Sequence, residues 1–220
     1  MSEAAGSETA GAVASGLDQI AARIRACRIC RDNPKGAPLP HEPRPVFRVS
    51  AMARVAIAGQ APGTRVHKSG VPFTDPSGVR LRAWMGVTEA EFYDQSRIAI
   101  VPMGFCFPGL DAKRGDRPPR SECAPAWRTE LFEAMPQIEL VLAVGQYAQW
   151  CHLPGPRRPV TETVRRFAAT SNAPAEPGKP RCLPLPHPSW RNTGWIKANP
   201  WFEAEVLPCL RAEVRRLIDL

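Results

Sequence analysis

No run of apolar residues in this sequence approaches the roughly 20 that a helix needs to cross a bilayer. Residues 1–16 are rich in Ala, Gly and Ser, and they have neither the basic start nor the continuous apolar stretch of a secretory signal. We therefore expect a cytoplasmic protein with no membrane partner. Residues 1–16 are predicted to form a disordered tail ahead of a single domain over residues 17–220.

The chain also lacks a long basic run that would concentrate positive charge, although its composition is basic. Lysine and arginine total 29 against 21 aspartate and glutamate residues, so the formal net charge is +8. Most of the excess is arginine, whose planar guanidinium pairs well with phosphates. The charge favours a polyanionic partner such as nucleic acid, but a soluble surface with a basic bias accounts for it equally well.

Disulfide bonds are not expected, because the seven cysteines are an odd number in a protein assigned to a reducing compartment. Cys27 and Cys30 form a Cys-x-x-Cys pair, and Cys106 and Cys123 form a second, wider pair. Four thiolates suit zinc or an iron–sulfur cluster equally, and scattered buried thiols are the alternative. The other three cysteines fit no ligand spacing and are predicted to be small buried apolar side chains: Cys151, Cys182 and Cys209.

Four short apolar runs, each bounded by turn residues, have the length of β-strands. They extend over Arg54–Gly59, Arg97–Met103, Glu139–Gly145 and Arg181–Pro186. Helical patterns lie between them, and residues 141–144 are apolar on both faces, as in buried parallel strands. The predicted fold class is α/β, a three-layer α/β/α sandwich with a central, mainly parallel four-stranded sheet. We expect a monomer.

Apolar residues at helical spacing predict helices over residues 17–24, 77–85 and 125–135. A C-terminal helix is predicted from Val206 to Ile218, with Pro208 either kinking it or starting it. Residues 153–180 are rich in proline, arginine and small polar residues. They are predicted to form a long loop that overhangs the ligand crevice.

Two segments that follow predicted strands carry residues suited to binding and chemistry. The first is Gly59–Gly63, Gly-Gln-Ala-Pro-Gly, and the second is His187–Thr193, His-Pro-Ser-Trp-Arg-Asn-Thr. Loops at the carboxyl ends of parallel strands form the ligand crevice of an α/β sheet, so the two segments are predicted to converge on one small pocket. The first would supply backbone amides, and the second an imidazole.

Together these segments resemble motifs A and B of the uracil-DNA glycosylase superfamily; below, motif A is Gly59–Gly63 and motif B is His187–Thr193. The Pro-Phe-Thr sequence within Val71–Gly78 is similar to a segment of the iron–sulfur families four and five. The resemblance implies a monofunctional DNA glycosylase. Such an enzyme flips uracil or a related deaminated base out of DNA and hydrolyses its N-glycosidic bond, which initiates base excision repair.

The resemblance also implies roles for residues in the base pocket. Phe73 would stack on the flipped base, and the His187 imidazole would donate a hydrogen bond to uracil O2 as the base leaves as an anion. Asp75 or Gln60 would orient the attacking water, although Asp75 also stands where an N-cap of the next helix is expected. The base would in addition contact motif A through Gly59, Gln60 and Ala61.

Motif B supplies the residues that the resemblance places on DNA. Ser189 would hold a phosphate, while Trp190 or Arg191 would act as a wedge in the gap left by the flipped nucleotide or as a phosphate clamp. Asn192 is also predicted to contact DNA. The predicted partner is DNA that contains uracil or another deaminated base.

For the cysteines, the resemblance implies a 4Fe-4S cluster, with zinc as the alternative. The ligands would be Cys27, Cys30, Cys106 and Cys123.

Two departures from the family pattern concern specificity and chemistry. Ala61 stands where the classical uracil enzymes carry a water-activating aspartate, and Val101–Cys106 has no side-chain amide where family four reads uracil. We therefore expect a broader range of deaminated bases. The alternatives are a uracil-DNA binding protein on the same fold, either non-catalytic or covalently trapping, and a zinc-stapled nucleotide-binding domain.

Overall fold

The computed structural model describes residues 16–170 and 178–219, so nearly all of the predicted N-terminal tail lies outside the described residues. Residues 16–25 are helical. None of the helices in the described part of the chain combines the length and the apolar character that a membrane span requires. The labelled helices are α2 (Ile29–Asp32), α3 (Thr64–Ser69), α4 (Pro76–Met85), α5 (Glu89–Tyr93), α6 (Cys123–Glu133), α7 (Gln146–His152), α8 (Val160–Thr170), α9 (Thr193–Ala198) and α10 (Leu207–Ile218).

The four predicted strands are present and form one sheet. They are β1 (Val55–Ala58), β2 (Ile98–Ile100), β3 (Leu140–Val144) and β4 (Arg181–Leu185), in the order β2-β1-β3-β4. Every neighbouring pair is parallel. The chain passes from β1 to β2 on one side and then to β3 on the other, so the strand order reverses at β1. Ligand crevices of α/β proteins open at such a reversal, and motif A follows β1 directly.

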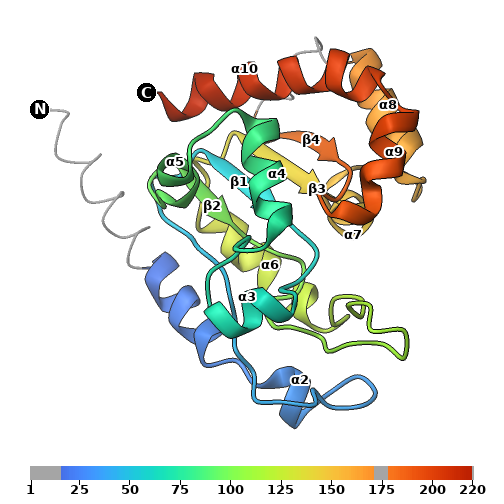
Figure 1. The fold of residues 1–220 in the computed structure, drawn as a ribbon. Helices are drawn as coiled ribbons and strands as arrows, with labels where there is room; N and C mark the ends of the chain where they lie inside the picture. Colours follow the sequence, from blue (N-terminus) through green and yellow to red (C-terminus); the bar gives the residue numbers. More distant parts are fainter. Residues whose placement is uncertain (1–15, 171–177, 220) are drawn as a thin grey trace, which may run out of the picture.

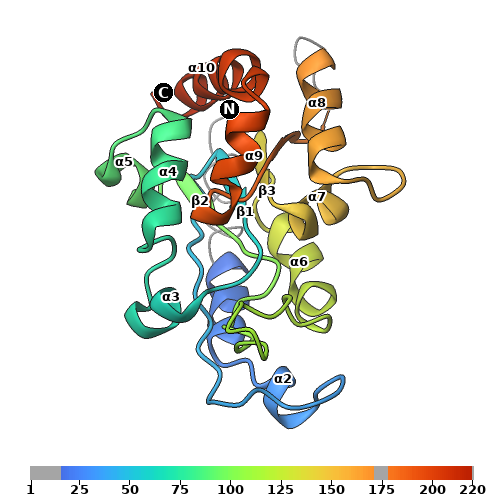
Figure 2. The same ribbon diagram turned by 45° about the vertical axis from the view of Figure 1, so that its right-hand side comes forward.

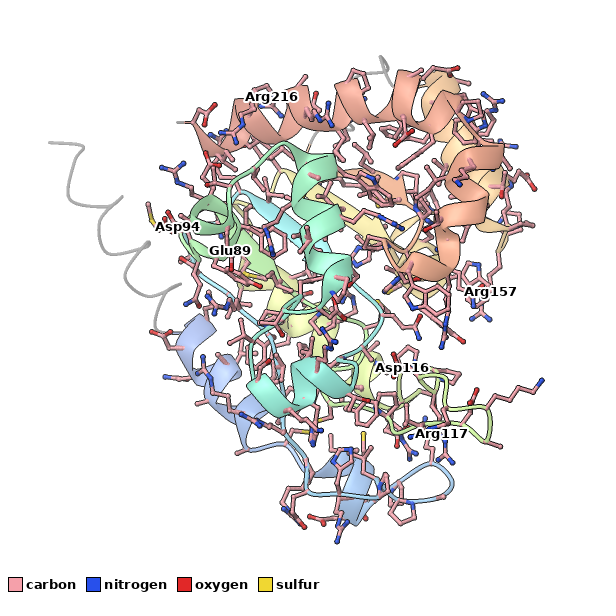
Figure 3. All side chains as sticks on the ribbon, viewed as in Figure 1. Glu89, Asp94, Asp116, Arg117, Arg157 and Arg216 are labelled. Atoms are coloured by element: carbon pink, nitrogen blue, oxygen red, sulfur yellow. The ribbon has the colours of Figure 1, made fainter. Side chains whose placement is uncertain are left out.

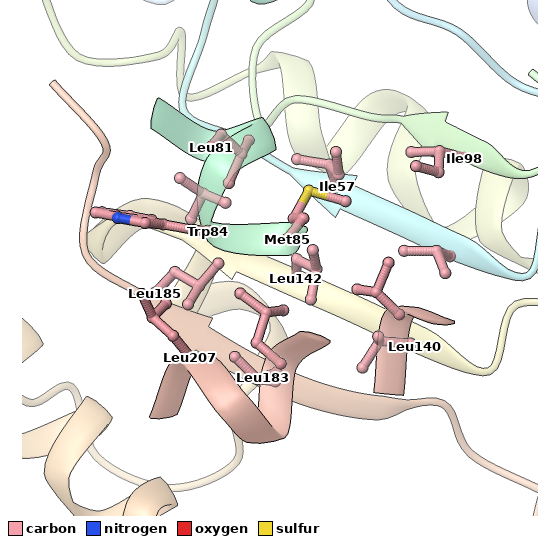
Figure 4. Packing of buried hydrophobic residues seen from close by; sticks show 14 of the residues in the cluster. Ile57, Leu81, Trp84, Met85, Ile98, Leu140, Leu142, Leu183, Leu185 and Leu207 are labelled. Atoms are coloured by element: carbon pink, nitrogen blue, oxygen red, sulfur yellow. The ribbon is translucent and has the colours of Figure 1, made fainter. Parts of the chain in front are cut away.

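Helices cover both faces of the sheet, which confirms the predicted three-layer sandwich (Figures 1 and 2). On one face, large side chains such as Ile57, Ile98 and Leu142 pack against α4 and α10 (Figure 4). The alternate strand residues face the other way and are mostly alanines, including Ala56 and Ala99. Small side chains let the 16–25 helix and α6 pack closely there.

The C-terminal segment settles the role of Pro208. A short π-helix spans Phe202–Val206, and α10 begins directly after it with Pro208 in its first turn. Proline is tolerated at this position because the first N–H groups of a helix have no partner within it. Pro208 therefore starts α10 rather than kinking it.

The prediction of one long loop over residues 153–180 was wrong, because α8 occupies Val160–Thr170. Val164 is fully buried in the core, and Val160, Phe167 and Ala168 pack against it. These positions repeat at helical spacing, but the proline- and arginine-rich flanks hid the pattern. Residues 171–177 of the predicted loop lie outside the described range.

The connection between β2 and α6 is long and carries Asp116 and Arg117 (Figure 3). Its middle part is a small hairpin in which Leu110 and Asp116 form an isolated antiparallel bridge. The Arg117 amide also donates to the Gly109 carbonyl at 3.0 Å. These bonds give the connection a defined shape beside the carboxyl end of the sheet.

Candidate active site

Motifs A and B meet in one small pocket at the carboxyl edge of the sheet, as predicted. β1 leads into motif A and β4 into motif B, while β3 lies between the two strands. All the residues assigned from sequence to the base and to catalysis line this pocket: Gly59, Gln60, Ala61, Phe73, Asp75 and His187.

Motif A is fastened to the segment that follows β2. The carbonyls of Gly59 and Gln60 accept hydrogen bonds from the amides of Met103 and Gly104, at 2.8 and 3.0 Å. A Cβ atom on Gly59 would lie 3.4 Å from Cζ of Phe73, so the phenyl ring sits directly over the start of the motif. A glycine at this point lets the ring lie against the motif A backbone with no side chain between them.

Phe73 is held in an unusual backbone conformation, with a φ of 56°. The Tyr93 hydroxyl donates to the Pro72 and Phe73 carbonyls at 3.0 and 3.2 Å. A Cβ atom on Gly78 would lie only 1.8 Å from the Phe73 carbonyl oxygen, so only glycine fits there. A left-handed bulky residue is strained, and its neighbours maintain it here beside the pocket.

Asp75 caps α4, as its sequence position predicted. Its side chain accepts from the amides of Ser77 and Gly78, at 3.0 and 3.3 Å, and from the Ser77 hydroxyl. Asp75 also lines the same pocket as His187, and its charge acts to raise the pKa of His187. The capping role and a place in the pocket are therefore combined in one side chain.

His187 is held in one tautomer. The Ser189 amide lies 3.2 Å from Nδ1 of His187, and because a backbone amide only donates, Nδ1 is the acceptor. The neutral ring then carries its proton on Nε2. Burial lowers the pKa of His187, and the charge of Asp75 opposes this shift only in part. A neutral imidazole that donates from Nε2 suits the role predicted for it.

Motif B is supported by two side-chain hydrogen-bond systems. Arg80 of α4 donates to the Ser189 carbonyl at 2.8 Å and to the Thr193 hydroxyl at 3.1 Å. The Asn192 amide donates to the His187 carbonyl at 2.7 Å, so this residue, predicted to contact DNA, braces the loop. Arg80 was missed from sequence, because no local pattern links α4 to a loop more than 100 residues further along the chain.

Trp190 and Arg191 project from motif B into solvent. Trp190 is 73% exposed, although it is a large aromatic residue. The Arg191 guanidinium lies 5.8 Å from the centre of its ring. Both side chains are therefore free to contact a partner that approaches this edge of the pocket.

One further pocket residue was missed. Asp116, from the hairpin before α6, lines the same pocket as Phe73 and His187. It belongs to no motif, and its sequence neighbours Arg114, Gly115 and Arg117 are typical of a solvated loop. Only the folding of the hairpin over motif A brings it to the site.

The four cysteines predicted as ligands lie in one neighbourhood. Burial raises the pKa of Cys123 to about 12, and the charges of Cys30, Cys106 and Cys27 each add to this rise. The Phe105 amide donates to the Cys123 sulfur at 3.4 Å. As they stand, the described residues contain no group of three or more His, Cys, Asp or Glu positioned around a metal ion. Four thiols in one neighbourhood are nevertheless a soft donor set of the kind that zinc or an iron–sulfur cluster takes.

The remaining cysteines are less buried than predicted. Cys151 is exposed, whereas Cys182 and Cys209 are half-buried. Cys151 and Cys182 line a separate cavity beside α7 and β4. Cys182 nevertheless packs against the core, and burial raises the pKa of its thiol to about 12.

A comparison with protein-family models matches residues 47–211 to the uracil DNA glycosylase superfamily. The match covers most of the chain, including both motifs, the whole sheet and the pocket between them. It agrees with the resemblance drawn from motifs A and B. The chain belongs to the uracil DNA glycosylase superfamily.

Proposed function

We propose that the protein is a DNA glycosylase that hydrolyses the N-glycosidic bond of uracil or a related deaminated base and so initiates base excision repair. The observation that carries this proposal is the convergence of motif A, Phe73 and His187 on one pocket in a member of this superfamily. A flipped base would be extruded into that pocket and read on its hydrogen-bonding edge.

In the proposed reaction Phe73 stacks on the flipped base, and Nε2–H of His187 donates to a base carbonyl. The bond between C1′ of the sugar and the base nitrogen breaks, and the base leaves as an anion stabilised by that donor. A water molecule bonds to C1′ and gives up a proton. Asp75 or Gln60 orients this water, and Asp75 is the better base because a carboxylate accepts a proton more readily than an amide does; both residues line the pocket with His187.

DNA would approach the exposed side chains of motif B. Trp190 would fill the gap left by the flipped nucleotide, while Arg191 and Ser189 would contact phosphates. The net charge of +8 supports this partner, since each neutralised phosphate releases a counterion. We propose a monomer as the active form.

We further propose that Cys27, Cys30, Cys106 and Cys123 bind a 4Fe-4S cluster, with zinc as the alternative. When bound, the metal would act as a structural cross-link. It would tie the N-terminal segment to the β2–α6 connection and the start of α6. Because that connection carries Asp116, the metal site would also support the pocket.

The wild-type protein tests the proposed activity directly. Single-stranded oligonucleotides with one uracil or one hypoxanthine should yield abasic sites and free base, and faster than paired duplexes, where flipping costs more. A strand with cytosine at the same position is the control. A band crosslinked to DNA without free base would instead identify the covalently trapping protein. That alternative is compatible with Ala61, which stands where the classical uracil enzymes have their water-activating aspartate.

Asp75→Asn separates the two roles of that residue. Asparagine caps helices as well as aspartate, so we expect the melting temperature to stay nearly unchanged. Base release should slow by about 10²-fold, because the amide cannot accept a proton from water. Thr88→Ala, which removes the cap of α5 away from the pocket, should show the opposite pattern of lower stability at an unchanged rate. Parental rates for Asp75→Asn would leave Gln60 as the residue that orients water.

A further inference from the structure

Asp116 is placed at the pocket by the backbone of its hairpin. Besides the Leu110–Asp116 bridge, the Asp111 carboxylate accepts from the amides of Lys113 and Gly115, at 2.9 and 2.7 Å. These bonds close the turn that precedes Asp116. The backbone position of Asp116 therefore follows from a defined loop conformation.

The Asp116 side chain points at motif A. A Cβ atom on Gly63 would lie 3.3 Å from its Oδ2 oxygen, so glycine at that position lets the carboxylate approach the backbone. Although the residue as a whole is exposed, burial of its carboxylate raises the pKa of Asp116. Arg191 opposes this shift, and the charges of Asp75 and Asp111 add to it. The carboxylate thus lies among pocket residues on one side and motif B on the other.

The ionised carboxylate at this place offers only hydrogen-bond acceptors and has no hydrogen of its own to donate. Deamination changes the hydrogen-bonding edge of a base at one ring nitrogen, which turns from an acceptor into a donor. N3 of cytosine and N1 of adenine are acceptors, but the same ring nitrogens in uracil and hypoxanthine carry a hydrogen. An acceptor that faces this nitrogen bonds to the deaminated base and leaves the parent base unpaired, which a buried site rejects strongly.

We propose that Asp116 is the specificity-determining residue of the pocket: it accepts a hydrogen bond from the ring N–H that deamination creates, and so selects the deamination products of cytosine and adenine over their parents. This inference rests on the proposed function of the same pocket. It supplies the base-reading group that the amide-free segment Val101–Cys106 lacks. Guanine already carries N1–H, so the criterion does not separate guanine from xanthine.

Asp116→Asn is the most direct test, because an amide can turn to present either an oxygen or an N–H group. We expect release of uracil to slow by about tenfold, since a charged acceptor is replaced by a neutral one. The preference for uracil over cytosine should fall by about 10²-fold, as the turned amide can now bond to cytosine. Asp18→Asn, at an exposed site on the 16–25 helix, changes the net charge equally and should leave both quantities unchanged.

Binding measurements keep this test separate from that of the proposed function. Fluorescence anisotropy with single strands carrying 2′-fluoro-2′-deoxyuridine or 2′-fluoro-2′-deoxycytidine reports base preference without cleavage. A wild-type preference for the uridine strand that Asp116→Asn abolishes supports the inference, even if no base is ever released and the proposed activity fails. An equal preference in wild type and Asp116→Asn, or no wild-type preference at all, overturns it.

Discussion

Replacing His187 by alanine is expected to slow single-turnover release of uracil by about 10²-fold or more, the usual effect of removing one preorganised donor to a developing anion. The tautomer supports this expectation, because the Ser189 amide occupies Nδ1 and leaves the proton on Nε2. The lowered pKa of His187 favours the neutral ring, so the imidazole donates without adding charge to the pocket.

Affinity for uracil-containing DNA should change little in His187→Ala, since phosphate contacts supply most of the binding energy. His187→Gln, which keeps an N–H donor, should recover part of the rate. His41→Ala provides a matched control, as this half-buried histidine does not line the pocket. If His187→Ala releases base as fast as the parent, the imidazole only braces motif B.

Replacing Cys106 or Cys123 by serine is expected to abolish metal binding and to prevent stable folding. Structural metal sites contribute about 10 kcal/mol or more, which is comparable to the whole stability of a typical domain. Burial raises the pKa of both Cys106 and Cys123 to about 12, so without a metal both would be neutral thiols at pH 7. Anaerobically purified wild-type protein should be brown and contain about four iron atoms per chain.

Cys209→Ser is the control, because this half-buried cysteine lies in the first half of α10 and is not one of the proposed ligands. It should keep the metal and the melting temperature of the parent. Colourless protein with about one zinc per chain would replace the cluster by zinc while keeping the four ligands. Protein that folds normally without either metal would show that the four cysteines are ordinary buried thiols.

Much of the fold could be predicted from sequence, because its elements depend on local patterns. The apolar runs at residues 55–58 and 140–144 have strand length and turn residues at their ends, and both became central strands. Helix α8 was missed because its four core-facing residues stand between proline- and arginine-rich flanks. A periodic pattern is informative only where its boundaries are also recognised.

The sequence by itself determined the family, the parallel sheet and the two motifs, since each depends on residues close together in the chain. Only the tertiary structure decided which side chains surround those motifs. Arg80 and Asp116 belong to no recognisable pattern, and they reach the site through the direction of α4 and the path of the hairpin. Their roles depend on contacts between segments remote in sequence, and composition and spacing carry no record of such contacts.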